Sequence, residues 1–80
     1  MSINLPQLRT RARQYRITKN LPTGGVVLFW RDQAYGWKNC LRDPQHECPG
    51  ALAVDADGRV HQAIDGNERD GAQRWQEVAA

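Results

Sequence analysis

The sequence predicts an α+β fold, in which one N-terminal helix packs on a four- or five-stranded antiparallel sheet built from two hairpins. Residues 5–15 carry apolar side chains at the spacing of a helix that covers another surface. Residues 26–38 and 51–64 each contain two short apolar or aromatic runs joined by a polar turn, which is typical of a β-hairpin. The 80 residues are enough for a single domain, residues 1–80, whose core must use nearly every large apolar side chain.

The N-terminal helix has a clear start and a narrow apolar face. Asn4 is a good N-cap, and Pro6 suits the first turn because its missing N–H would have no partner there. Helical spacing places four apolar side chains on one side, namely Leu5, Leu8, Ala12 and Tyr15. The helix should end before Pro22.

The register of the first hairpin decides which aromatic residues enter the core. A loop of two or four residues places Trp30 opposite Tyr35 and gathers the large side chains on one face. That face comprises Val26, Leu28, Trp30, Tyr35 and Trp37, with Leu28 opposite Trp37. A three-residue loop would instead pair Phe29 with Tyr35 and send Trp30 to the far side. We favour the first register, because it forms a large aromatic surface against which the helix can pack.

The second hairpin has a more specific turn signal. Residues 51–54 and 59–64 flank the sequence Asp-Ala-Asp-Gly. A three-residue loop with Gly58 in the left-handed conformation pairs Val54 with Val60 on the buried face. This turn also accounts fully for the acidic residues, which lack the further oxygen ligands of a calcium loop.

The secondary structure of two other segments is predicted less specifically by their residues. Residues 39–50 carry two prolines and several polar side chains, so they predict a surface loop. Residues 72–78 fit a short last strand or a helical turn almost equally well.

Charge is distributed unevenly along the chain, although the net charge is only +2. Residues 1–42 contain eight basic side chains and one acid, a net charge of +7, whereas residues 43–80 contain three basic side chains and eight acids, a net charge of −5. The two halves could neutralise each other in the fold, or they could mark surfaces for a partner.

The composition favours a cytoplasmic protein without membrane contacts. The longest purely apolar run, residues 26–30, is far shorter than the ~20 residues that cross a bilayer. The N-terminus MSINLPQLRTRAR lacks the apolar segment of a secretion signal. Reduced cysteines are therefore expected.

Metal binding and catalysis are not predicted. Cys40, His46, Cys48 and His61 are the right ligand types for Zn²⁺, but seven residues separate the two cysteines where compact zinc sites use two to four. We expect Cys40 to be buried and Cys48 to face solvent. A nucleophilic pair of His46 and Cys48 is disfavoured because Pro49 removes the next backbone donor. We expect a protein that is not an enzyme and has no cofactor.

Nucleic-acid binding is the alternative function. Arg9, Arg13 and Arg16 form a ridge on one flank of the predicted helix that could contact phosphates. Exposed Trp and Tyr rings on the sheet could stack bases. The same rings, however, provide the only surface large enough to receive the helix, which would leave no stacking platform.

The segments GVVLFW, YGWKNCLRDPQHECPGALAVDADGRV and DGAQRW together resemble a family of small antirestriction proteins, ArdR, carried by integrative conjugative elements of proteobacteria. The resemblance covers roughly residues 24–76. It implies an accessory protein of a mobile genetic element that helps incoming DNA survive host defence.

The leading functional prediction is therefore a small, cofactor-free interaction protein that binds and inhibits a host protein, with a restriction-type defence system as the candidate. Both charged halves supply the predicted partner-binding residues, which are Arg9, Arg13, Arg16, Arg42, Asp65, Glu68 and Asp70.

Overall fold

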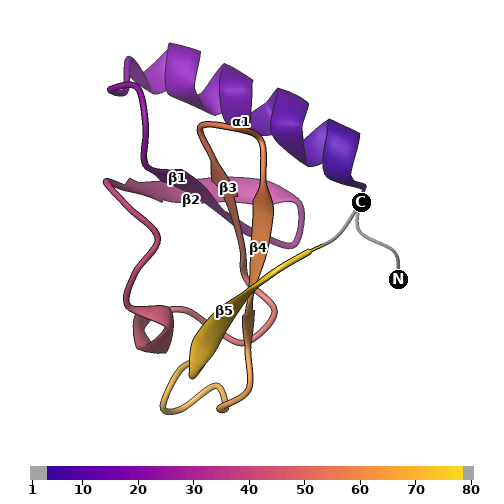
Figure 1. The fold of residues 1–80 in the computed structure, drawn as a ribbon, viewed down its shortest axis with the longest axis vertical. Coiled ribbons are helices and arrows are strands. Elements are labelled where there is room, and N and C mark those ends of the chain that lie inside the picture. The colour runs from indigo at the N-terminus through magenta and orange to yellow at the C-terminus, as the bar shows by residue number, and fades with distance from the viewer. Residues whose placement is uncertain (1–3, 79–80) are drawn as a thin grey trace.

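The computed structural model describes residues 4–78 and contains one long helix and a five-stranded antiparallel sheet (Figure 1). The elements are α1 (Leu5–Lys19), β1 (Val26–Trp30), β2 (Gln33–Lys38), the short 3₁₀ helix η1 (Pro44–His46), β3 (Leu52–Asp55), β4 (Val60–Ile64) and β5 (Arg74–Glu77). The strands lie in the order β2-β1-β3-β4-β5. The predicted α+β fold is confirmed, with five strands and with residues 74–77 as the last of them.

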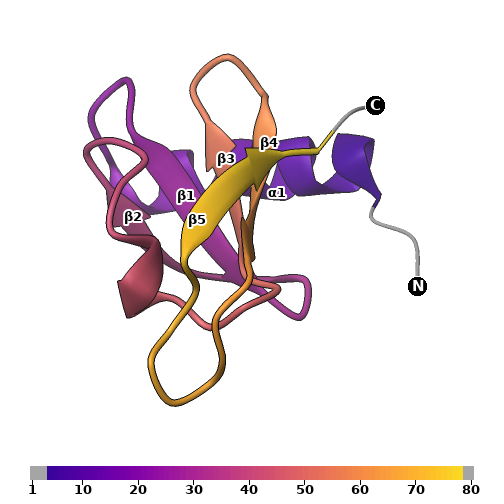
Figure 2. The same ribbon diagram turned by 60° about the horizontal axis from the view of Figure 1, so that its bottom comes forward.

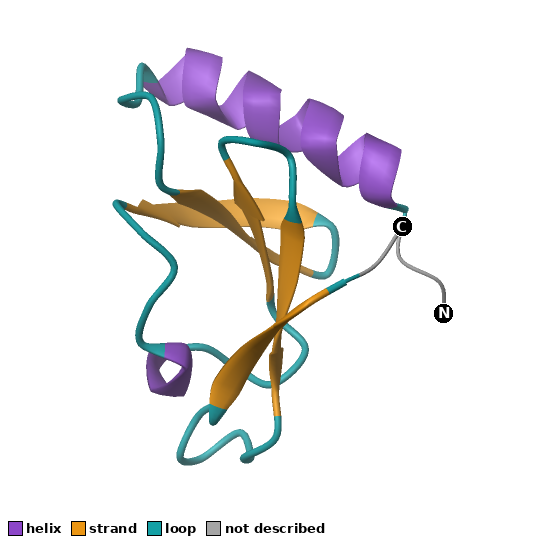
Figure 3. Ribbon diagram, in the orientation of Figure 1, coloured by secondary structure: helices purple, strands orange, loops and turns teal. Residues whose placement is uncertain are grey.

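Helix α1 lies across one end of a strongly twisted sheet, and the loop from β4 to β5 lies at the other end (Figure 3). Asn4 caps the helix as predicted, since its side chain accepts a hydrogen bond of 3.1 Å from the backbone N–H of Gln7. Asn20 ends the helix in the left-handed conformation, two residues before Pro22. Among residues 4–78, no helix combines the length and the apolar character needed to cross a membrane.

Each face of the sheet has its own apolar cluster. Figure 2 shows α1 behind the sheet, on one of these faces. The cluster under α1 contains Leu5, Leu8, Ala12, Val27, Phe29, Val54 and Val60. The opposite cluster contains Val26, Leu28 and Ala53, against which Leu41 and Trp75 pack. The successive residues of β1 alternate between the two clusters, as strand geometry requires.

The second hairpin forms as predicted. Val54 pairs with Val60, and Leu52 pairs with Gln62. Gly58 has a φ of +85°, the left-handed conformation that its turn needs. His61 lies opposite Ala53 on the face away from α1.

The predicted register of the first hairpin is wrong. Its loop has two residues, Arg31 and Asp32, both with positive φ as a type I′ turn requires. Tyr35 is an extra residue on β2, because Leu28 pairs with Gly36 while Phe29 pairs with Ala34. This bulge reverses the faces of all residues beyond it.

The bulge also decides which aromatic rings the helix covers. Trp37 lies opposite Val27 and packs in the cluster under α1, whereas Trp30 and Tyr35 do not. Trp30 is 37% exposed and Tyr35 is 47% exposed. The predicted face with all three rings against α1 therefore does not form, and Phe29 takes the buried position instead.

Trp37 fits closely against the turn that precedes β1. Its indole N–H donates a hydrogen bond of 3.2 Å to the carbonyl oxygen of Gly24. A Cβ atom at Gly25 would lie 2.7 Å from the Trp37 ring, so position 25 must be glycine.

Replacing Trp37 by Ala should lower the free energy of unfolding by about 3–5 kcal/mol, because it leaves a cavity beneath α1. The matched control Trp30→Ala should cost clearly less, since the Trp30 ring is partly exposed. Urea denaturation followed by circular dichroism measures both losses. Equal losses for the two variants would contradict this assignment of the rings.

Candidate functional site

An open groove of about 410 Å³ lies beside the first hairpin, on the face of the sheet away from α1. Its lining comes from β1, β2 and the segment that follows β2, and consists of Trp30, Gln33, Tyr35, His46, Glu47, Cys48 and Ala51. The groove therefore combines exposed aromatic rings with one buried carboxylate.

Trp30 is held at one end of this groove by its backbone and by its neighbours. It is the last residue of β1 and pairs with Gln33 across the two-residue turn. Its ring packs close to Gly50, where an added Cβ atom would lie 3.5 Å away. The guanidinium of Arg31 lies 5.4 Å from the ring centroid, which is a cation–π distance.

Glu47 fixes the other wall of the groove. It is 6% exposed, and its Oε2 lies 2.7 Å from the Nζ of Lys38. Its Oε1 accepts a hydrogen bond from the hydroxyl of Tyr35. Its backbone carbonyl also accepts a 3.0 Å hydrogen bond from the N–H of Ala72, which ties the segment to the chain before β5. All of these contacts hold residues 39–50 against the sheet.

The environment of Tyr35 keeps its hydroxyl protonated. Burial raises the pKa of Tyr35 well above its usual value, and the hydrogen bond to Glu47 and the negative charge of Glu47 raise it further. The hydroxyl therefore stays a donor to Glu47, and the exposed part of the ring offers an apolar surface.

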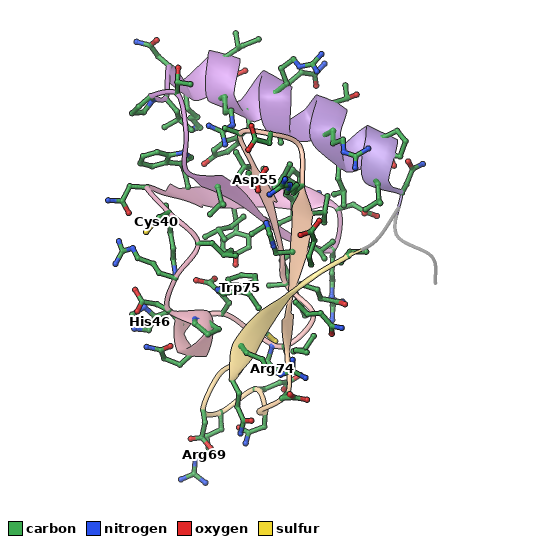
Figure 4. The ribbon with its side chains drawn as sticks, in the orientation of Figure 1. Cys40, His46, Asp55, Arg69, Arg74 and Trp75 are labelled. Atoms are coloured by element: carbon green, nitrogen blue, oxygen red, sulfur yellow. The ribbon has the colours of Figure 1, made fainter. Side chains whose placement is uncertain are left out.

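The cysteines and histidines do not converge as a metal site. Within residues 4–78, no group of three or more His, Cys, Asp or Glu side chains is placed to hold a metal ion. His61 instead lies 3.1 Å from the Oδ2 of Asp55. Cys40, labelled in Figure 4, is exposed, so the prediction that it is buried is wrong. Cys48, which was predicted to face solvent, is half-buried. Cys40 lies beyond the end of β2 in an irregular segment and belongs to none of the apolar clusters of the described residues.

The predicted arginine ridge forms, but two of its members hold other parts of the chain. The Nε of Arg9 donates a 2.6 Å hydrogen bond to the carbonyl of Gly58, and Arg16 binds the carbonyls of Gly24 and Gly25. Arg13 lies between them and is exposed.

The other predicted partner-binding residues lie outside α1. Arg42 is paired with Asp43 at 2.9 Å, and Asp65 is paired with Arg74 at 3.0 Å. Asp70 accepts a 3.2 Å hydrogen bond from Asn67. Arg69, between the exposed Glu68 and Asp70, lies at the end of the molecule opposite α1 (Figure 4). The seven predicted residues therefore belong to separate surfaces.

Comparison with protein-family models, with curated proteins and with solved structures finds no match for this chain.

Replacing Glu47 by Gln should lower the free energy of unfolding by about 2–4 kcal/mol, because the mostly buried Lys38 loses its counter-charge. The double variant Lys38→Met/Glu47→Gln removes both charges and should recover part of the loss. Chemical denaturation of the three proteins measures the coupling. A single variant as stable as the wild type would show that Glu47 does not fix the loop.

Stability should fall at acidic pH through Asp55. Burial alone would raise the pKa of Asp55, but hydrogen bonds from His61 and from the backbone of Arg59 and Asp57 outweigh burial and lower it. A carboxyl group with a lowered folded-state pKa stabilises the fold above its unfolded pKa and loses that contribution as pH falls. Asp55→Asn should therefore be less stable than wild type at pH 7 and show a weaker acid dependence below about pH 5. Denaturation across a pH series tests this.

Proposed function

We propose that this chain is a non-enzymatic interaction protein that binds a protein partner through the groove between Trp30 and Tyr35. The observation that carries the proposal is the exposure of these two rings in a domain that has only six aromatic residues. With Arg31 beside Trp30, the groove presents the three residue types that most often dominate binding energy in protein interfaces.

The rigidity of the groove supports the same proposal. Trp30 directly precedes a two-residue turn and pairs with Gln33 across it, and the Tyr35 hydroxyl is bound to the buried Glu47. Side chains that are already ordered lose little conformational freedom when they bind. A partner would therefore meet a preformed surface.

The partner that we propose is a host protein in the bacterial cytoplasm, of a restriction-type defence system. The resemblance of residues 24–76 to the antirestriction family supports this choice. Inhibition by contact needs no cofactor and no catalytic residue, which agrees with a surface of aromatic side chains and one arginine.

A second candidate function is binding of single-stranded nucleic acid in the same groove. The exposure of Trp30 and Tyr35 favours it, because such rings stack bases and Arg31 could contact a phosphate. It ranks second because Lys38, the other cation near the groove, is neutralised by Glu47. The arginine ridge of α1 lies on the opposite side of the sheet and cannot contact the same segment of a bound strand in this groove.

In cells that restrict unmodified DNA, the wild-type protein should raise the transformation efficiency of unmodified plasmid. The double variant Trp30→Ala/Tyr35→Ala should lose this protection, because truncation of interface anchors typically costs 2 kcal/mol or more, roughly thirtyfold in affinity. Arg69→Gln is the matched surface control and should protect fully. A protective, folded double variant would rule out the groove as the binding site.

The two candidate functions separate by nucleic-acid affinity. If the partner is a protein, the purified chain should show no groove-dependent binding of an oligothymidylate at about 0.15 M salt. Tight binding that is lost in the double variant and weakens steeply with salt would favour the nucleic-acid function instead. Fluorescence anisotropy of a labelled oligonucleotide makes this measurement.

A further inference from the structure

A hollow of about 250 Å³ lies between α1 and the turn that joins β3 to β4. Arg9, Arg13 and Arg16 line its helix side, and its apolar lining residues are Ala12, Val54 and Ala56. The three arginines follow a spacing of four and three residues, which places them on one side of the helix. All three side chains therefore line the same hollow.

The guanidinium groups of Arg9 and Arg16 are held by hydrogen bonds to backbone carbonyls, and each still has unused N–H donors. An arginine side chain has five N–H donors. Arg9 uses its Nε for the carbonyl of Gly58, and Arg16 uses one donor from each terminal nitrogen for the carbonyls of Gly24 and Gly25. These acceptors are neutral, so each arginine keeps its full positive charge.

No carboxylate of residues 4–78 forms an ion pair with these arginines. The ion pairs of the described chain are Lys38–Glu47, Arg42–Asp43, His61–Asp55 and Arg74–Asp65. The three arginines that line the hollow therefore have no carboxylate counter-ion within the described chain.

Two acidic residues line the far side of the hollow and must be considered. Asp55 turns its carboxylate elsewhere, because Oδ1 accepts hydrogen bonds from the N–H groups of Asp57 and Arg59 and Oδ2 contacts His61. Asp57 is exposed at the tip of the turn. Of the two carboxylates that line the hollow with the three arginines, only that of Asp57 is not engaged in hydrogen bonds of this kind.

We propose that this hollow binds a phosphate group through the guanidinium groups of Arg9, Arg13 and Arg16. A planar carboxylate is matched by the fork of a single arginine, whereas a tetrahedral phosphate can accept hydrogen bonds from several directions. The volume also leaves room for a substituent on the phosphate. The phosphate comes either from a free phosphate or from a nucleic-acid backbone. This site lies on the opposite side of the sheet from the groove and does not depend on the proposed function.

The test is a titration of the wild-type protein with sodium phosphate, compared with sodium chloride at equal ionic strength and pH 7. The side-chain N–H resonances of Arg9, Arg13 and Arg16 are observed by ¹⁵N–¹H NMR. Phosphate should shift them saturably, and chloride should not. A parallel titration with an oligothymidylate of about eight nucleotides distinguishes the two sources, since preferred saturation by either one supports the site and names its source.

Arg13→Gln is the informative variant, because Arg13 holds no loop and its loss should leave the fold intact. It should weaken phosphate binding about tenfold or more, as expected for the loss of charge-assisted hydrogen bonds. Arg69→Gln removes the same charge at the opposite end of the molecule and should change the affinity less than about twofold. Asp57→Asn should strengthen binding, because it removes the only nearby carboxylate that is not already engaged.

Three results would overturn the proposal. One is a linear response to phosphate that matches the response to chloride, with no saturation by the oligonucleotide either. Another is an equal loss of affinity in Arg13→Gln and Arg69→Gln, which would mean that net charge alone attracts the anion. The third is weaker binding in Asp57→Asn, which would mean that this carboxylate is itself a ligand of the bound species.

Discussion

The arrangement of the sheet face away from α1 depends on the contacts of the buried Glu47 carboxylate. That face presents Val26, Leu28 and Ala53, and the segment that covers it contributes few apolar side chains of its own. A short polar segment cannot stay on a sheet through the hydrophobic effect alone. Glu47 holds it there by an ion pair with Lys38 and a hydrogen bond from Tyr35, both on the edge strand β2. The same two bonds build one wall of the groove, so the stability of this face and the shape of the candidate site have a common origin.

Local sequence signals were sufficient for α1 and for the second hairpin. The N-cap Asn4, the spacing of Leu5, Leu8 and Ala12, and the glycine of the β3–β4 turn each specify a backbone conformation by themselves. The first hairpin was predicted as an element but not in its register. Its turn, Arg31-Asp32, adopts positive φ without the Asn-Gly or Asp-Gly pair that usually indicates it. The bulge at Tyr35 has no local signal, because it depends on what each face of β2 meets in the fold.

The candidate site was less predictable than the fold, for a related reason. The cluster of aromatic residues around Trp30 was evident, but hydrophobicity alone placed all of it in the core. Glu47 was hidden in a polar segment, where an acidic side chain is normally solvated. Its burial follows from the position of Lys38 on a strand nine residues earlier, a relation that only the tertiary fold establishes. The arginine ridge was predicted from helical spacing, whereas the attachment of Arg9 and Arg16 to backbone carbonyls required the positions of two turns.

The ion pairs of the fold show how the unevenly distributed charges of the chain are arranged. If the two halves neutralised each other, the basic residues of α1 would be paired with acids from the second half. Instead, the four ion pairs of the described residues leave out every basic residue of α1. Arg9, Arg11 and Arg16 donate to carbonyl oxygens, which stabilise the packing of α1 without reducing its charge. The sheet therefore separates a cationic helix surface from an aromatic groove whose nearest lysine is neutralised. A ligand for either surface must match only the chemistry of that surface, and the two can be altered by mutation independently.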